Sequence, residues 1–157
     1  RAVILRHRAE IEEILSRTSA LAIAGGHVAV LLNRLKIFAV LDYAATRPIL
    51  AWSAGAMVLA ERIVLFHDSP PQGMGSAEIL GQGLGLVPGV VPLPHAKRRL
   101  HLDDPKRMAL FSRRFAPAVC VTLDQGSRLD WDGERLDAGD GTFTLLSDGT
   151  LGGRAAA

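Results

Sequence analysis

The sequence predicts an α/β domain with a mostly parallel sheet flanked by helices and a small antiparallel meander near the C-terminal end. Two observations lead to this prediction. Short apolar runs alternate with stretches of helical periodicity, and such alternation is typical of parallel sheets with crossover helices. Closely spaced Asp-Gly and Gly-Asp turn signals after residue 130 then separate very short strands, as in a meander.

Composition places the chain among ordinary globular domains. Its 157 residues suffice for a hydrophobic core, so we treat 1–157 as a single domain. Apolar residues make up 48% and charged residues 22%, and the net charge of +2 gives no reason to expect nucleic acid as a partner. No apolar stretch reaches the ~18 residues of a membrane span, so we expect no membrane partner. A single cysteine, Cys120, allows no disulfide within the chain and favours a cytoplasmic location.

Apolar periodicity gives the elements of the first part of the chain. The apolar start predicts a short strand at 3–5, and the spacing of Ile11, Ile14 and Leu15 predicts an amphipathic helix over 8–17. The elements expected next are a strand at 20–24, helices at 27–35 and 38–45, a strand at 48–52 and a helix from Ala54 onward.

Turn and capping signals divide the rest of the chain. The Gly- and Pro-rich segment 68–89 predicts a loop, and Asp104-Pro105 predicts a helix start because an acid caps a helix well and proline suits its first turn. The elements expected here are strands at 63–66, 89–95 and 118–123, a helix from 105 to 115 and the final meander.

Residues 51–56, Ala-Trp-Ser-Ala-Gly-Ala, have the layout of a nucleophile elbow, in which a serine sits on a tight turn between a strand and a helix. Ser53 is then the candidate nucleophile, and the N–H of Ala54 at the helix start can stabilise an oxyanion. The usual pattern has glycine two residues before the serine, where this chain has the small residue Ala51. The alternative interpretation is that the small residues only permit close packing.

A serine nucleophile needs a base, which is most often histidine. His95 is the candidate because it ends an apolar strand, and ligands of parallel sheets bind beyond the carboxyl ends of the strands. Gly25-Gly26 follows another strand, so it either forms a turn with positive φ or donates an N–H to an oxyanion hole. His27, which comes next, is expected to line the same crevice.

Five segments together carry a resemblance to a known family. They are Ala-Gly-Gly-His at 24–27, Trp-Ser-Ala-Gly-Ala at 52–56, Leu-Gly-Leu-Val-Pro-Gly-Val-Val at 84–91, Pro-His at 94–95 and Leu-Asp-Gln-Gly at 123–126. In order and rough spacing they resemble the serine peptidases that include aspartyl dipeptidase and cyanophycinase, whose fold is similar to that of class I glutamine amidotransferases. The resemblance implies a Ser-His-Glu triad with Ser53 as nucleophile and His95 as base. It places Gly25 or Gly26 and Ala54 at the oxyanion hole and implies no cofactor and no metal.

The chain departs from the family pattern at three points. The acid of the family lies in a motif like Asp-Glu-Gly-Thr-Ala, and Gln125 occupies that position here. An amide can orient an imidazole but lacks the charge that stabilises an imidazolium, so neighbouring Asp124 is an alternative acid. The family has Asn where this chain has His27. Family members also begin with further strands, so we interpret the chain as the C-terminal portion of a longer family domain.

Two functions follow from these residues. The first is a serine exopeptidase, similar to a dipeptidase, that hydrolyses a small acidic peptide whose carboxylate meets Arg98 and Arg99. The second is a catalytically impaired member that binds a ligand or a protein, because Gln125 replaces the acid. A homodimer is expected to cover the sheet edges left open by the absent strands. A glutamine amidotransferase is excluded because its nucleophile is a cysteine at the elbow, whereas Cys120 lies on another predicted strand.

Overall fold

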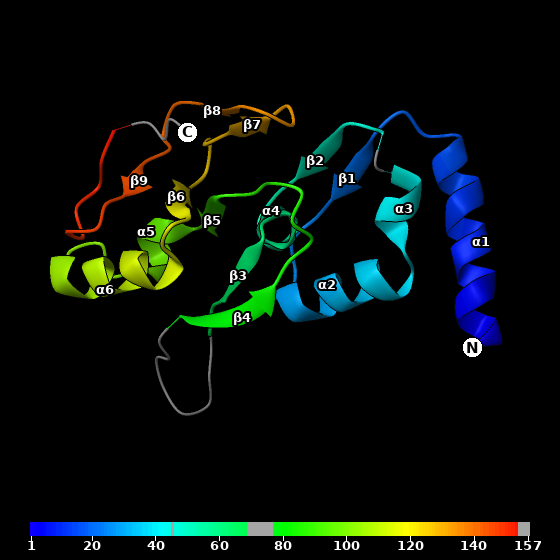
Figure 1. Ribbon diagram of the computed structural model, residues 1–157, viewed down its shortest axis with the longest axis horizontal. Coiled ribbons are helices and arrows are strands. Elements are labelled where there is room, and N and C mark those ends of the chain that lie inside the picture. The colour runs from blue at the N-terminus through cyan, green and yellow to red at the C-terminus, as the bar shows by residue number, and fades with distance from the viewer. Residues whose placement is uncertain (45, 69–76, 154–157) are drawn as a thin grey trace. The chain divides into compact units, whose positions relative to one another are not determined.

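A computed structural model describes residues 1–44, 46–68 and 77–153 of the chain. The chain divides into two compact units, Arg1–Ala56 and Met57–Ala157. Each unit contains helices and strands (Figure 1), which confirms the α/β class. Among the helices described, none is long and apolar enough to cross a membrane.

The first unit places helices around a pair of parallel strands. Its elements are α1 (Ala2–Ser16), β1 (Leu21–Ile23), α2 (Val28–Ile37), α3 (Val40–Ala44), β2 (Ile49–Ala51) and the start of α4 (Ala54–Leu59). Strands β1 and β2 lie side by side (Figure 1), with Leu21 opposite Ile49 and Ile23 opposite Ala51. Because the strands are parallel, the segments that leave their carboxyl ends emerge at the same edge of the pair.

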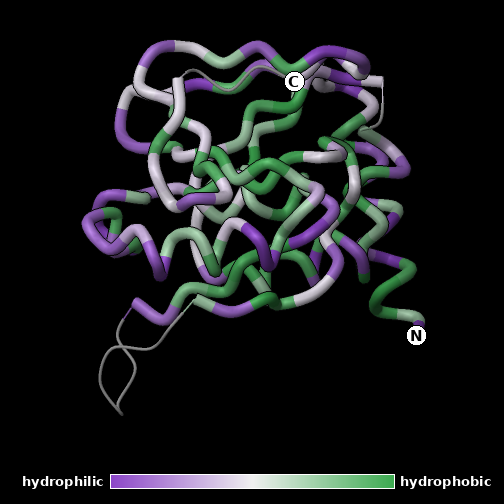
Figure 2. Tube along the Cα trace, turned by 60° about the vertical axis from the view of Figure 1, so that its left-hand side comes forward, coloured by the Kyte–Doolittle hydropathy of each residue, from purple (hydrophilic) through white to green (hydrophobic). Residues whose placement is uncertain are grey.

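The predicted strand at 3–5 is wrong, because these residues belong to α1. A helix satisfies its own backbone hydrogen bonds, whereas a strand needs a neighbour. Glu10 accepts a 2.8 Å hydrogen bond from His7 and lies 3.6 Å from the Arg6 guanidinium, and pairs at this spacing support a helix. The apolar side chains at the start of α1 lie mostly in solvent, where Figure 2 shows green near the N-terminus.

The second unit contains three small sheets and two helices in its described part. Its elements after α4 are β3 (Arg62–Leu65), β4 (Glu78–Gln82), β5 (Val90–Pro94), α5 (Ala96–Arg99), α6 (Pro105–Phe115), β6 (Val119–Leu123), β7 (Leu129–Trp131), β8 (Leu136–Ala138) and β9 (Thr144–Leu145). Strand β6 lies between parallel β5 and antiparallel β9, while β3–β4 and β7–β8 are antiparallel pairs.

The sheets are therefore small and mixed, rather than one mostly parallel sheet. Part of the difference is β4, which lies inside the predicted loop and pairs with β3 across an irregularity between Ile63 and Val64. The predicted meander also differs, because β9 joins β6 and leaves β7–β8 as a separate hairpin. The buried Thr122 on β6 shows why: its N–H donates to the carbonyl oxygen of Phe143, next to β9.

Strand β5 and one face of α6 are buried in the second unit. All five residues of β5 are buried, so its end is held firmly where the chain reaches His95. Helix α6 buries Met108, Phe111 and Phe115 on one face, and the two phenylalanine rings lie 5.2 Å apart between centroids. The sequence-predicted helix start is confirmed, since the Asp104 side chain accepts a 3.0 Å hydrogen bond from the Arg107 N–H.

Candidate active site

Ser53 lies on a strained turn directly after β2 and before α4. Its φ is 55°, in the left-handed region that non-glycine residues adopt at a cost of about 1–2 kcal/mol. Hydrogen bonds fix the turn on both sides: the Trp52 N–H donates to the Ile23 carbonyl oxygen at 3.2 Å, and the Gly55 N–H donates to the Trp52 carbonyl oxygen at 3.0 Å. The backbone therefore has the strand, turn and helix of a nucleophile elbow.

Gly25 lies against the Ser53 side chain within the first unit. A methyl group on Gly25 would stand 3.0 Å from Ser53 Cβ, 3.1 Å from Ser53 Oγ and 4.0 Å from the Ala54 nitrogen. The Ala54 N–H begins α4, so it has no acceptor within that helix. The Gly25 backbone, the Ser53 hydroxyl and the Ala54 N–H thus form one local group.

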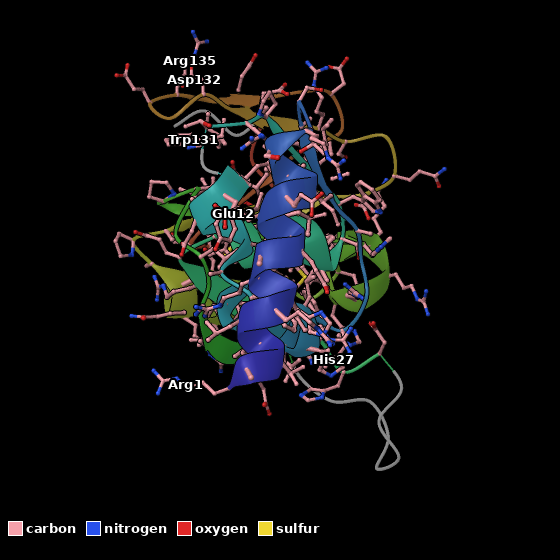
Figure 3. All side chains as sticks on the ribbon, turned by 90° about the vertical axis from the view of Figure 1, so that its right-hand side faces the viewer. Arg1, Glu12, His27, Trp131, Asp132 and Arg135 are labelled. Carbon is pink, nitrogen blue, oxygen red and sulfur yellow. The ribbon has the colours of Figure 1, made fainter. Side chains whose placement is uncertain are left out.

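Gly26 and His27 complete the loop between β1 and α2. Gly26 has a φ of 137°, which requires glycine, so the turn interpretation applies at this position. His27 is the N-cap of α2 with an extended backbone and an exposed side chain (Figure 3). Gly25 itself lies next to the Ser53 side chain, so its backbone is near the candidate nucleophile.

His95 also has a left-handed backbone, with φ 57° and ψ 41°. It leaves β5 as the N-cap of α5, and its N–H donates a 2.9 Å hydrogen bond to the Leu123 carbonyl oxygen at the end of β6. The imidazole is exposed on this turn. As predicted, the histidine lies where a buried strand ends.

Asp124, the alternative acid, and Gln125, at the acid position of the family, lie on the turn that follows β6. The Asp124 carboxylate accepts a 3.2 Å hydrogen bond from the Lys97 N–H, so it caps the first turn of α5 beside His95. Gln125 is exposed in the turn closed by the Ser127 N–H and the Asp124 carbonyl oxygen. Across 1–44, 46–68 and 77–153, no hydrogen bond joins the His95 ring to either side chain.

Asp68 is a residue near His95 that the sequence reasoning missed. Its carboxylate forms a bidentate ion pair with Arg99, with Nε–Oδ1 and Nη2–Oδ2 distances of 2.8 and 2.6 Å. The hydrogen bond from Arg99 lowers the pKa of Asp68 below 3.8, and the charges of Arg99, Arg98 and His95 add to this effect. Asp68 comes from a segment predicted only as loop, and no sequence signal pairs it with Arg99.

Arg98 and Arg99, the residues expected to meet a substrate carboxylate, have different surroundings. Arg98 is exposed, whereas the Arg99 side chain is only 17% exposed and already pairs with Asp68. Arg99 also borders a cavity of about 120 Å³ with His101, Arg107 and Arg114. That cavity is not lined by His95, so it is separate from the candidate base.

Among the described residues, neither the Cys120 thiol nor the side chains that commonly bind metal ions form a further reactive centre. The Cys120 thiol is fully buried on β6, and burial raises its pKa to about 12. Within the described ranges, no group of three or more His, Cys, Asp or Glu side chains is arranged to bind a metal ion.

Comparison with known proteins identifies the family. The model of peptidase family S51 matches residues 3–138, and the chain belongs to this family. This result confirms the assignment indicated by the motifs at 24–27, 52–56 and 94–95.

A solved structure shows the same fold. A crystal structure of a peptidase from an acI-B1 Actinobacterium superposes with a TM-score of 0.60 at 16% sequence identity. The match covers 95% of this chain and 64% of the other, so the chain spans less than two thirds of that peptidase. No curated protein sequence matches the chain. At this identity the likeness is evidence of the fold alone.

Proposed function

We propose that the protein is a serine-dependent peptidase, similar to a dipeptidase, that hydrolyses a small acidic peptide with Ser53 as nucleophile and His95 as general base. One observation carries the proposal. Among the described residues, the non-glycine residues with positive φ are Ala39, Ser53 and His95, and two of these are the candidate catalytic residues of a family S51 chain. Strained backbone of this kind clusters at functional sites.

In the proposed reaction, Ser53 Oγ attacks the carbonyl carbon of the scissile peptide bond while His95 accepts the hydroxyl proton. The N–H groups of Ala54 and of Gly25 or Gly26 stabilise the oxyanion that forms. The C–N bond then breaks as His95 donates its proton to the leaving amine, which leaves an ester on Ser53. Water hydrolyses that ester with His95 again acting as base. This mechanism needs Ser53 and His95 within hydrogen-bonding reach of each other.

Gln125 is the residue of the proposed site that fits the mechanism least well. Its amide oxygen can orient the imidazole but cannot stabilise an imidazolium by charge, which in a related triad costs about 10⁴ in turnover. Asp124 is the alternative acid, because its carboxylate accepts a hydrogen bond from the N–H of Lys97, two residues after His95. If neither group supports His95, the second candidate function applies, in which the protein binds a ligand or a partner protein without hydrolysis.

The acidic substrate class rests on positive charge beside His95. Lys97 and Arg98 are both exposed on α5, and exposed cations attract a carboxylate by simple electrostatics.

The fold class similar to glutamine amidotransferases and a cytoplasmic location belong to the same proposal. So does a homodimer, for which the exposed apolar side chains of Val3 and Leu5 on α1 offer surface. Sedimentation that gives a clean monomer would rule out the dimer.

The test is intact-mass spectrometry after treatment with a fluorophosphonate serine probe. We expect a single adduct on the wild type, no adduct on Ser53→Ala, and an unchanged adduct on Ser147→Ala, which removes an exposed serine from the turn after β9. An adduct that persists on Ser53→Ala would overturn the assignment of the nucleophile. Folded wild-type protein without any adduct would favour the binding function.

A further inference from the structure

We propose that Arg99 is a positioning residue for His95, and that Asp68 anchors Arg99 in this role. The inference rests on the proposed function, because the orientation of His95 matters to catalysis only if this residue is the base. Arg99 thereby receives a different role from the one expected from the sequence, where it meets a substrate carboxylate.

The backbone on either side of His95 is fixed by hydrogen bonds. The peptide group between Pro94 and His95 makes two hydrogen bonds. The His95 N–H donates to the Leu123 carbonyl oxygen at 2.9 Å, and the Pro94 carbonyl oxygen accepts from Arg99 Nη1 at 3.4 Å. The carbonyl oxygen of His95 itself accepts from the N–H groups of Arg98 and Arg99, both at 3.0 Å. Both peptide planes that define φ and ψ of His95 are therefore restrained, and Arg99 contacts each of them.

The left-handed backbone of His95 needs this restraint. A non-glycine residue with φ 57° costs about 1–2 kcal/mol and persists only where the surroundings enforce it. Without the Arg99 side chain, this peptide plane is held only by the hydrogen bond from the His95 N–H to Leu123. We expect the plane then to tilt and to shift the His95 imidazole with it.

Asp68 and Phe66 fix the guanidinium that makes these contacts. The bidentate ion pair with Asp68 sets the plane of the guanidinium, and its carbon lies 4.9 Å from the centroid of the Phe66 ring. Because Nε and Nη2 both donate to Asp68, it is Nη1 that donates to the Pro94 carbonyl oxygen. A lysine cannot reproduce this arrangement, because an ammonium is a point charge without a planar fork.

Two other roles fit the contacts less well. A substrate carboxylate would have to displace Asp68 from a side chain that is only 17% exposed, while the neighbouring Arg98 is exposed. Asp68 as the missing triad acid is also disfavoured, because the Arg99 guanidinium already neutralises its carboxylate. A positioning role uses both side chains as the structure has them.

The experiment measures the saturable kinetics of fluorophosphonate labelling for the wild type, Arg99→Ala, Arg99→Lys and Asp68→Asn. We expect the maximal labelling rate of Arg99→Ala to fall by about 10- to 100-fold, since a small misplacement of a catalytic group has this effect. The half-saturating probe concentration should stay within about twofold of the wild-type value. Arg99→Lys should be nearly as slow, and free guanidinium at low concentration should restore part of the rate of Arg99→Ala.

Controls separate this inference from loss of fold and from the proposed function. Arg113→Ala removes an exposed arginine of α6 and should label at the wild-type rate. If Arg99→Ala does not fold, Asp68→Asn decides, with an expected fall in the same rate. Wild-type rates in Arg99→Ala and Asp68→Asn would overturn the positioning role and leave Ser53 and His95 in place. An unlabelled wild type would overturn the proposed function and this inference with it.

Discussion

Gly55 lies so close to the end of β1 that a methyl group on its Cα would stand 2.1 Å from the carbonyl oxygen of Ile23. The same carbonyl oxygen accepts the N–H of Trp52, so it is held on the strand and cannot move away at low cost. The close approach of α4 to β1 therefore depends on glycine two residues after Ser53. It is the packing reason for the last position of the elbow motif.

Gly55→Ala should consequently destabilise the protein and distort the turn at Ser53. Overpacking of this kind typically costs about 1–3 kcal/mol, and here the methyl group meets backbone rather than a flexible side chain. Urea unfolding should show this loss, with fluorophosphonate labelling reduced in the folded fraction. Gly153→Ala is the matched control, because a methyl group there meets nothing within 4 Å. Equal stability of both variants would contradict the close approach.

Gln125→Glu should increase the reactivity of Ser53 if Gln125 occupies the acid position of the triad. A carboxylate would stabilise the imidazolium of His95, and the cost of an amide in a related triad suggests a gain of up to about 10⁴ in rate. The rate of fluorophosphonate labelling measures the gain. Asn33→Asp adds the same charge on the exposed face of α2 and should have no effect.

Asp124→Asn tests the alternative acid in the same assay. If labelling collapses in Asp124→Asn and does not change in Gln125→Glu, the carboxylate that caps α5 supports His95 and the family position is not used. If Gln125→Glu gains and Asp124→Asn is neutral, the family position is the functional one. Loss in both variants would show that the turn after β6 tolerates neither change.

Cys120 should be inert in the native protein. Its side chain is fully buried and burial raises its pKa to about 12, so the thiolate that reacts with thiol reagents is scarce near neutral pH. Iodoacetamide should leave the native mass unchanged and add one group after unfolding in urea. Complete modification of the folded protein would show that β6 is open to solvent. An inert Cys120 would also argue against sulfur as the site of a fluorophosphonate adduct.

Many elements could be predicted because their boundaries depend on the residues within and next to them. The Asp104 cap and Pro105 start α6, and the apolar run from Val90 ends at His95 as expected. The turn at Ser53 follows from small residues in the right order. Patterns of this kind need no knowledge of distant neighbours.

The errors concern pairings between distant segments. The apolar start of α1 has the composition of a strand, whereas the contacts of Glu10 with Arg6 and His7 support the helix that it forms. Strand β4 exists because β3 offers it an edge, which the Gly- and Pro-rich sequence conceals. The Asp68–Arg99 pair joins residues 31 positions apart, so no local spacing reveals it.

The Asp68–Arg99 pair should make stability fall in acid. The pKa of Asp68 is lowered in the folded state, chiefly by the hydrogen bond from Arg99, so ionised Asp68 favours folding. Its contribution is fully present above the unfolded pKa near 3.8 and disappears as the pH falls through the lower folded value. Because the Asp68 side chain is 45% exposed, solvent screening should limit the contribution to less than about 1 kcal/mol.

Urea unfolding of the wild type and Asp68→Asn over a range of pH checks this prediction. The wild type should be the more stable of the two near neutral pH, and the difference should shrink as the pH drops below about 4, because protonation removes the charge that the variant already lacks. Asp103→Asn, an exposed neighbour of the Asp104 cap, should not change this pH dependence. A difference that stays constant down to about pH 2 would mean that it does not come from the charge of Asp68, and that the ion pair does not stabilise the folded protein.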